Sequence, residues 1–118
     1  MNKPAEFKYT LYDETYTIRL IISVYGYNNR TAILAETTEG EPFATFTVNL
    51  DDGRILDNDL VYLDTNNVPG VEEFFIENGL AVKTDRVQRS GYCTYPMVRL
   101  NFDKLKEVAK DLRFEGLW

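Results

Sequence analysis

The sequence contains no histidine and only one cysteine in 118 residues. Histidine is the usual general base near neutral pH and a common metal ligand, so its absence excludes Ser-His and Cys-His nucleophile pairs and the usual nitrogen ligands of zinc or iron. A single cysteine forms no disulfide within the chain. Catalysis would have to rest on Asp, Glu, Lys, Tyr or the one thiol. We therefore expect that the protein is not an enzyme.

Long apolar runs and phosphate-binding motifs are also missing. No stretch approaches the roughly 18 consecutive apolar residues of a membrane span, and residues 1–10 lack the apolar core of a signal peptide. Neither a Gly-rich dinucleotide fingerprint nor a P-loop occurs. Compact domains commonly contain about 100 to 150 residues. We expect one cytoplasmic domain over residues 1–118, with no cofactor and no membrane partner.

Acidic residues outnumber basic ones by 19 to 13, which gives a formal net charge of −6. Proteins that bind nucleic acid neutralise phosphates with clustered Lys and Arg. The balance therefore argues against direct nucleic-acid binding. A protein with a basic or neutral surface is the expected partner, and the oligomeric state does not follow from the sequence.

Apolar residues alternate with polar ones over much of the chain, which is the pattern of half-buried strands. The alternation predicts strands over residues 7–11, 16–24, 31–36 and 43–50, joined by turns. A short strand is expected at residues 60–63, an edge strand or extended loop at residues 81–89, and a further strand at residues 97–102. Strands that follow one another in this way form an antiparallel meander.

Two segments have the apolar spacing of amphipathic helices. In "NNVPGVEEFFIENGL", Asn67 is a candidate N-cap and Gly79 a C-terminal stop. The second segment follows Asp103, another candidate N-cap, and its apolar face is formed by Leu105, Val108, Ala109 and Leu112. The expected fold is α+β, an antiparallel sheet of about four to six strands with two helices packed on one face.

The stretch "RSGYCTYP", from Arg89 to Pro96, holds the single cysteine between two tyrosines. Cys93 would need a nearby cation or helix N-terminus to become a reactive thiolate, and Arg89 is the nearest cation in sequence. A lone cysteine beside aromatics is more often a small buried hydrophobe. Arg89, Tyr92 and Tyr95 are also residue types that anchor protein interfaces. A structural corner and an interface anchor both remain open.

Four aspartates gather in the middle of the chain, namely Asp51, Asp52, Asp57 and Asp59. An EF-hand loop needs oxygen ligands at fixed alternating positions, but Leu60 and Val61 follow Asp59. The sequence therefore predicts no metal site. The aspartates are expected to be solvated, or to contact a basic partner.

The segments "PFATFTVNL", "VYLDTNN", "EEFFIENGL" and "RSGYCTYPMVRLNF" resemble, in the same order, a family of small bacterial proteins described only as a domain of unknown function. The resemblance extends from about Tyr16 to Glu107. It implies a cytoplasmic accessory protein of the kind found in gut bacteria, plasmids, conjugative elements and phages. It implies no catalytic residues.

These observations favour a non-enzymatic protein-binding module of a bacterium or mobile element. One alternative is an anti-defence inhibitor whose acidic face occupies a nucleic-acid-binding protein. A second alternative is a small enzyme that uses Cys93 or carboxylates. Capture of a specific protein partner, as opposed to turnover of a substrate, separates the binding hypotheses from the enzymatic one.

Overall fold

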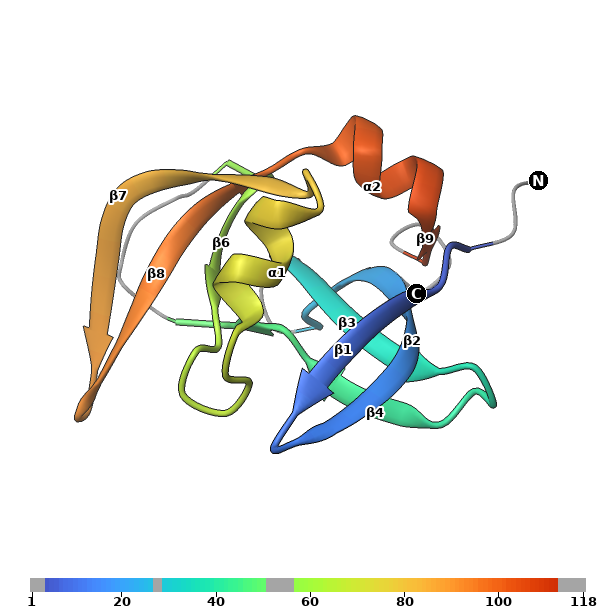
Figure 1. The fold of residues 1–118 in the computed structure, drawn as a ribbon. Coiled ribbons are helices and arrows are strands. Elements are labelled where there is room, and N and C mark those ends of the chain that lie inside the picture. The colour runs from blue at the N-terminus through green and yellow to red at the C-terminus, as the bar shows by residue number, and fades with distance from the viewer. Residues whose placement is uncertain (1–3, 27–28, 51–56, 113–118) are drawn as a thin grey trace.

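The computed structural model describes residues 4–26, 29–50 and 57–112. These residues form an α+β fold with two sheets and two short helices, which confirms the expected class (Figure 1). The first sheet contains β1 (Phe7–Leu11), β2 (Glu14–Val24), β3 (Thr31–Thr37) and β4 (Pro42–Thr45), with β9 (Ala109–Asp111) beside β2. The second sheet has the order β5 (Thr47–Val48), β6 (Leu60–Leu63), β8 (Cys93–Leu100) and β7 (Ala81–Ser90). The helices are α1 (Val71–Glu77) and α2 (Phe102–Val108).

The strand predicted over residues 43–50 is divided at Phe46, and this division makes two sheets in place of one. The Phe46 N–H donates to the carbonyl of Ile33 in the first sheet at 2.8 Å, and the Phe46 carbonyl accepts from the N–H of Asp64, next to β6, at 2.9 Å. Phe46 and Thr47 are both buried, so the expected alternation stops there. The Thr47 hydroxyl accepts from the Ile33 N–H at 3.2 Å, which satisfies this polar group inside the protein.

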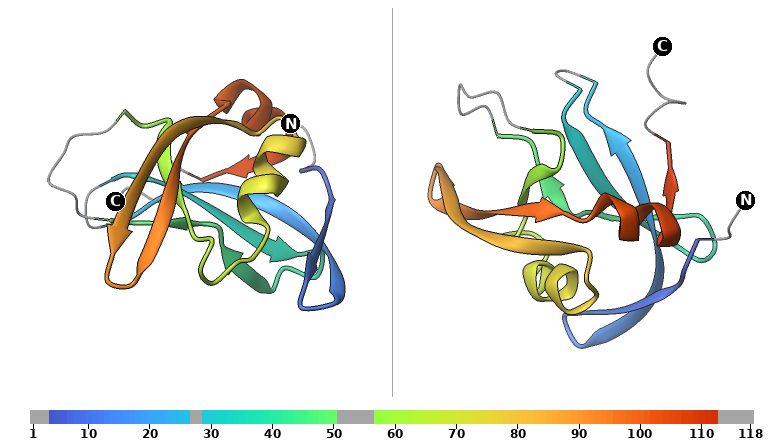
Figure 2. Two further views of the ribbon diagram at one scale, coloured as in Figure 1. Left: turned by 60° about the vertical axis from the view of Figure 1, so that its left-hand side comes forward. Right: turned by 90° about the horizontal axis from the view of Figure 1, so that it is seen from above.

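The main core lies between the first sheet and the second sheet, with α1 packed beside it (Figure 2). Ile18, Leu20 and Ile22 form the inward face of β2 and are fully buried, as their alternation predicts. Aromatic rings fill the centre of this core, with neighbouring centroids 4.9–6.5 Å apart. Seven rings take part, those of Phe7, Tyr9, Tyr16, Phe43, Phe46, Phe74 and Phe75.

Helix α1 buries the predicted apolar face but begins later than predicted. Asn67 is not its N-cap, because the Asn67 N–H donates to the Asp64 carboxylate at 3.1 Å in the preceding turn. Gly70 occupies the N-cap position with a φ of +84°, a conformation that glycine adopts without steric cost. Gly79, with a φ of +71°, follows the end of the helix as expected. Phe75 is fully buried on its inward face.

Helix α2 is shorter than predicted and has a different cap. The side chain of Asn101, and not that of Asp103, accepts from the Lys104 N–H at 3.1 Å. Leu105 is fully buried as expected. The helix ends at Val108 because the following residues pair with β2 as the parallel strand β9, beside the end of β1. Backbone hydrogen bonds along β2 thus replace the last predicted helical turn.

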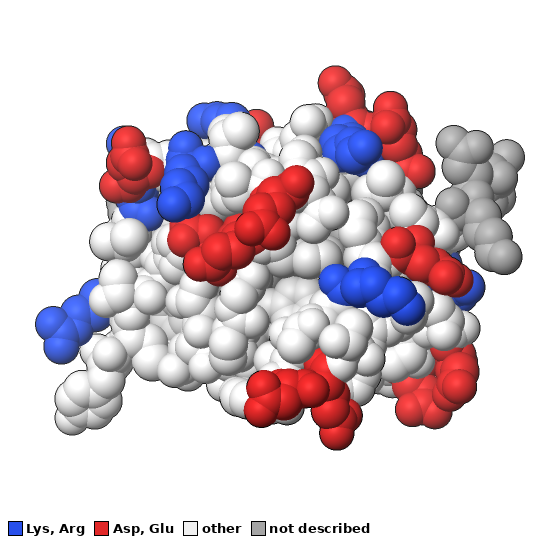
Figure 3. Space-filling view, viewed as in Figure 1, with Lys and Arg blue, Asp and Glu red and all other residues white. Residues whose placement is uncertain are grey.

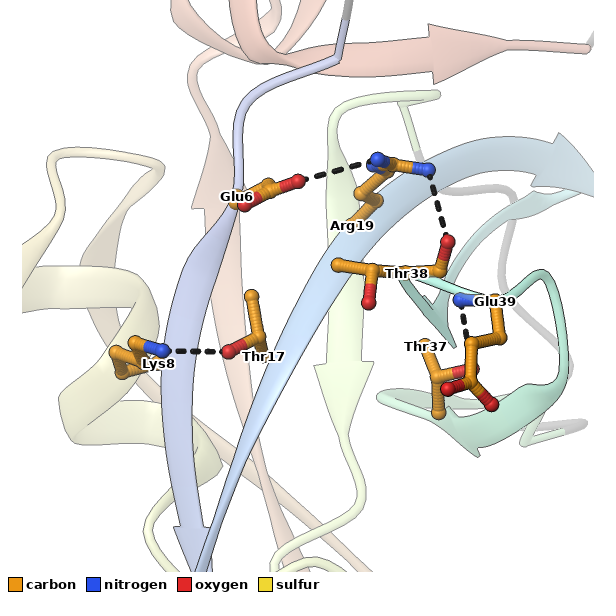
Figure 4. A network of polar contacts seen from close by, with 7 residues as sticks. All are labelled: Glu6, Lys8, Thr17, Arg19, Thr37, Thr38 and Glu39. Carbon is orange, nitrogen blue, oxygen red and sulfur yellow. Dashed lines mark hydrogen bonds and ion pairs between the residues drawn. The ribbon is translucent and has the colours of Figure 1, made fainter.

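Polar contacts connect the outer side of the first sheet (Figure 4). Arg19 on β2 donates to Glu6 at 3.1 Å and to the carbonyl of Thr38, in the turn between β3 and β4, at 3.4 Å. Lys8 on β1 donates to Thr17 on β2 at 2.6 Å. These side chains join β1 and β2 to the neighbouring turn, so we assign them a structural role.

Candidate functional site

The stretch from Arg89 to Pro96 forms the end of a long hairpin, and we call β7 and β8 with their turn the hairpin arm (Ala81–Leu100). Figure 1 shows the arm extending away from α1, with its turn at the far end. Ser90 pairs with Cys93, so Gly91 and Tyr92 form a two-residue turn. Gly91 has a φ of +62°, as the first central residue of a type II′ turn requires. The strand predicted from Met97 therefore begins four residues earlier.

The two faces of the arm separate Arg89 from the single cysteine. Arg89 lies opposite Thr94, whereas Cys93 lies opposite Ser90, one position along. Because successive side chains of a strand point to opposite faces, Arg89 and Cys93 are on different faces of the arm. This arrangement therefore gives no support to the hypothesis that Arg89 activates the Cys93 thiol. Cys93 is half-buried and packs against a small apolar cluster.

Tyr95 belongs to that same cluster and is 9% exposed. Its buried neighbours are Leu50, Tyr62 and Met97. A hydrogen bond with Cys93 is the main cause that raises the pKa of Tyr95 above its ordinary value, and burial adds to it. Tyr95 therefore lies apart from the exposed side chains of the arm, although it was grouped with Arg89 and Tyr92 from the sequence.

Tyr92 has the opposite environment, since its side chain is 100% exposed at the end of the arm. The Arg89 Nε donates to the Gly91 carbonyl at 3.2 Å, which holds the guanidinium group beside the turn. Val82 and Val87 on β7 are also more than half exposed. In the described part of the chain the only other large apolar side chain with such exposure is Tyr12. Exposed apolar groups are thus concentrated on the arm.

Positive charge is concentrated on the arm as well. It carries four basic residues, Lys83, Arg86, Arg89 and Arg99, and one acidic residue, Asp85. The arm therefore has a net charge of +3, and the other residues of the chain have a net charge of −9. Figure 3 shows basic side chains on the side of the molecule where the arm lies in Figure 1. The total of −6 conceals this separation.

The predicted acidic site is only partly described and is not a free acidic surface. The Arg99 Nη1 donates to both carboxylate oxygens of Asp59, at 2.8 and 2.9 Å, and lies 3.8 Å from an Asp57 oxygen. These contacts hold two of the predicted aspartates against the base of the arm. Asp51 and Asp52 lie outside the described residues. On the face in Figure 3, acidic groups form separate clusters with basic groups between them.

Other kinds of site have little support in the described residues. No group of three or more Cys, Asp or Glu side chains there could hold a metal ion. No helix in the described ranges is long and apolar enough to cross a membrane. A hollow of about 250 Å³ lies over β3 and β4, with Leu34 and Phe43 in its wall. Glu36 is the one ionisable residue among the described residues that line it.

Residues 19–115 match the family described as Domain of unknown function (DUF4313). The chain belongs to this family. The resemblance seen in the sequence is therefore confirmed as far as the family, and the setting in mobile elements stays a prediction. No curated protein and no solved structure matches the chain. The family description states no activity.

Proposed function

We propose that this chain is a non-enzymatic protein-binding module that contacts its partner through the hairpin arm. One observation carries the proposal, which is that Tyr92, the most exposed large apolar side chain among the described residues, lies close to Arg89 at the end of a projecting two-stranded element. Tyrosine and arginine are prominent among residues that dominate binding energy. Exposed apolar groups are a recurrent feature of interaction sites.

The arm also separates binding from folding. The buried residues of its base, such as Val98 and Leu100, belong to the main core, whereas Arg89 and Tyr92 contribute nothing to that core. A partner that covers the end of the arm would bury apolar surface that water now contacts, which favours association. The fold itself would need little change on binding.

The charge of the arm changes the expected chemistry of the partner. From the net charge alone, a basic or neutral protein was expected. The arm is positive, so a protein with an acidic or neutral surface fits this region better. The net charge of −9 on the other residues would repel the phosphates of a nucleic acid. We place the module in the cytoplasm of a bacterium, as an accessory protein of the cell or of a mobile element, in line with its single thiol and family resemblance.

Affinity capture from the native host tests the proposal. The tagged wild-type chain is compared with Tyr92→Ala and Arg89→Ala, and the matched control is Tyr12→Ala, which removes the exposed tyrosine of the β1–β2 turn. We expect a specific protein to be captured by the wild type and by the control, and to be lost from both arm variants. Equal capture by all four proteins would show that the arm is not the contact. Turnover in a broad substrate screen, lost in Cys93→Ser, would favour the enzymatic alternative.

A further inference from the structure

Strand β7 has one side that pairs with no other strand in the described part of the chain. The two-residue turn determines which of its backbone groups face that side. Ser90 and Cys93 close the hairpin, and in such a turn the closing pair exchanges both backbone hydrogen bonds. Bonded and non-bonded pairs alternate from there, so Gln88 bonds to Tyr95, and Arg89 directs its N–H and carbonyl outward.

The same alternation places Val87 opposite Pro96 at a non-bonded pair. Proline has no N–H to donate, and a non-bonded pair requires no hydrogen bond from Pro96 to β7. The N–H and carbonyl of Val87 therefore also point to the free side of the strand. Two donors and two acceptors thus face this side, since each residue supplies one of each. The Gln88 Nε2 already donates to the Arg89 carbonyl at 3.2 Å, so an added strand would replace this exposed side-chain hydrogen bond.

A bulge limits the free edge at its inner end. The register shifts between Lys83 and Val87, and Asp85 within the bulge has a φ of +65°. The Thr84 hydroxyl donates to the Met97 carbonyl at 2.8 Å and accepts from the Arg86 N–H at 3.2 Å. The Thr84 hydroxyl thus connects the bulge to β8 and satisfies the Arg86 N–H within it. The regular free edge is the segment Val87–Ser90.

We propose that Val87–Ser90 accepts an extended segment of the partner as an added strand, and that this segment alternates apolar with acidic residues on one face. The proposal rests on the protein-binding function above and names how the partner is recognised. Backbone hydrogen bonds supply the attachment in this mode, and alternate side chains supply the selectivity.

The side chains of β7 define the pattern that the added strand needs. Val87 and Arg89 lie on the same face, two positions apart. Residues opposite them on a neighbouring strand would lie about 5 Å away. An apolar residue opposite Val87 and a carboxylate opposite Arg89 match these two positions, and Arg86 adds positive charge at the inner end.

The same charges argue against two other occupants. A second copy of the chain, paired through its own β7, would bring Arg86 and Arg89 close to the like charges of the first, an arrangement that discourages edge-to-edge association. A nucleic acid would meet the negative charge carried by the other residues of the chain. An acidic extended peptide meets neither obstacle.

Synthetic peptides of eight residues test the inference with the full chain. In the first set, Val and Glu alternate on one face of the extended peptide and Thr occupies the other face. The second set carries Lys in place of Glu. The third set has a central Pro, which interrupts strand pairing. Binding is measured by fluorescence anisotropy, and amide exchange of the ¹⁵N-labelled protein is followed by NMR. We expect saturable binding of the Glu set only, with slower exchange of the Val87 and Arg89 amides on binding. The Gln88 amide should already be slow in the free protein.

Substitutions at one position separate backbone pairing from side-chain contact. Val87→Pro removes an outward donor, and we expect it to weaken peptide binding at least about tenfold. Val87→Thr keeps the N–H and the branched shape and should stay within about threefold of wild type. If Val87→Pro unfolds the arm, which loss of slow exchange at Gln88 would reveal, the exchange pattern of the wild-type complex decides the question by itself.

Several results would overturn the inference. One is a failure of the Glu peptides to bind at concentrations up to about 1 mM, and another is binding that does not slow the exchange of the Val87 and Arg89 amides. A single-stranded oligonucleotide that slows the exchange of these amides more than the peptides do would also contradict it. So would a dimer that forms through β7 and is detected by sedimentation. If partner capture depends on Tyr92 but is unaffected by Val87→Pro, the proposed function stands and strand addition is excluded. If the Glu peptides bind as expected but partner capture does not depend on Tyr92, strand addition stands and the proposed contact through Tyr92 is excluded.

Discussion

Tyr9 and Tyr92 show how differently the core and the hairpin arm use the same residue type. Tyr9 is 4% exposed, packs among the rings of Phe46 and Phe74, and donates its hydroxyl to the Pro69 carbonyl at 2.7 Å. Tyr92 is 100% exposed. The core ring stabilises the fold through burial and a satisfied hydroxyl, and the arm ring has no such role. Stability and binding are therefore expected to respond to different substitutions, and the four experiments below test that separation.

The largest expected effect comes from Phe46, where the chain passes from one sheet to the other. Its fully buried ring contacts those of Tyr9, Phe74 and Phe75. Phe46→Ala should lower the free energy of unfolding by about 3–5 kcal/mol, because it removes buried surface and leaves a cavity. Phe46→Leu, the control, should cost clearly less. Urea unfolding measures both, and a loss below about 1 kcal/mol for Phe46→Ala would contradict this account of the core.

The second effect depends on pH and belongs to Tyr9. Burial, with a smaller contribution from the negative charge of Glu73, raises the pKa of Tyr9 from 10.0 to about 12. The unfolded chain loses this proton near pH 10 and the folded chain near pH 12, so the folded state binds more protons between these values. The free energy of unfolding therefore falls as pH rises through this window, by up to about 3 kcal/mol.

Tyr9→Phe isolates that contribution, because the other tyrosines remain in both proteins. Near pH 8 the variant should be less stable by about 1 kcal/mol, through loss of the hydrogen bond to Pro69. Above pH 10 the wild type should lose stability faster than the variant, so their difference should shrink or reverse. Denaturant unfolding at pH 8, 10 and 11 measures this. Parallel pH profiles would show that Tyr9 ionises equally easily in the folded and unfolded states.

The sequence predicted most strands, since alternation is a local property that burial preserves. Ile18, Leu20 and Ile22 are all buried as predicted. The failures lie where a distant partner decides the outcome. Phe46 continues the alternation of its segment, yet its backbone bonds to two different sheets. Residues 109–111 have helical spacing, yet the open side of β2 captures them as a strand.

The candidate site was predicted by residue type but not by arrangement. Arg89 and Tyr92 stood out in the sequence, and the structure places both at the end of the arm. The pairing of Ser90 with Cys93 separates Arg89 from Cys93, and contacts with residues distant in sequence, such as Leu50 and Tyr62, bury Tyr95. A useful signal was present, because glycine followed by one residue between two alternating runs is typical of a type II′ hairpin. This signal was not used, and a structural corner and an interface anchor both stayed open for the stretch.

A third, smaller effect tests the cap of α2. The Asn101 side chain accepts from the Lys104 N–H, so Asn101→Ala should lower the free energy of unfolding by about 1 kcal/mol. Asp103, in the first helical turn, makes no such cap. Asp103→Ala should therefore cost only a few tenths of a kcal/mol, through loss of its interaction with the helix dipole. Thermal unfolding of both variants gives the order, and a larger loss for Asp103→Ala would restore the cap predicted from the sequence.

The smallest expected effect on stability is that of Tyr92→Ala. A fully exposed side chain at the end of a hairpin loses no packing when it is truncated, so the free energy of unfolding should stay within about 0.5 kcal/mol of wild type. Gly91 keeps the positive φ of the turn in this variant, whereas Gly91→Ala would strain it and should destabilise the arm measurably. Urea unfolding of both variants, compared with the partner capture described above, separates a role in stability from a role in binding.

Loss of capture in a Tyr92→Ala protein with unchanged unfolding would assign the arm to binding. A stability loss as large as that of Phe46→Ala would instead make Tyr92 part of the folded core and remove the contrast between the two tyrosines.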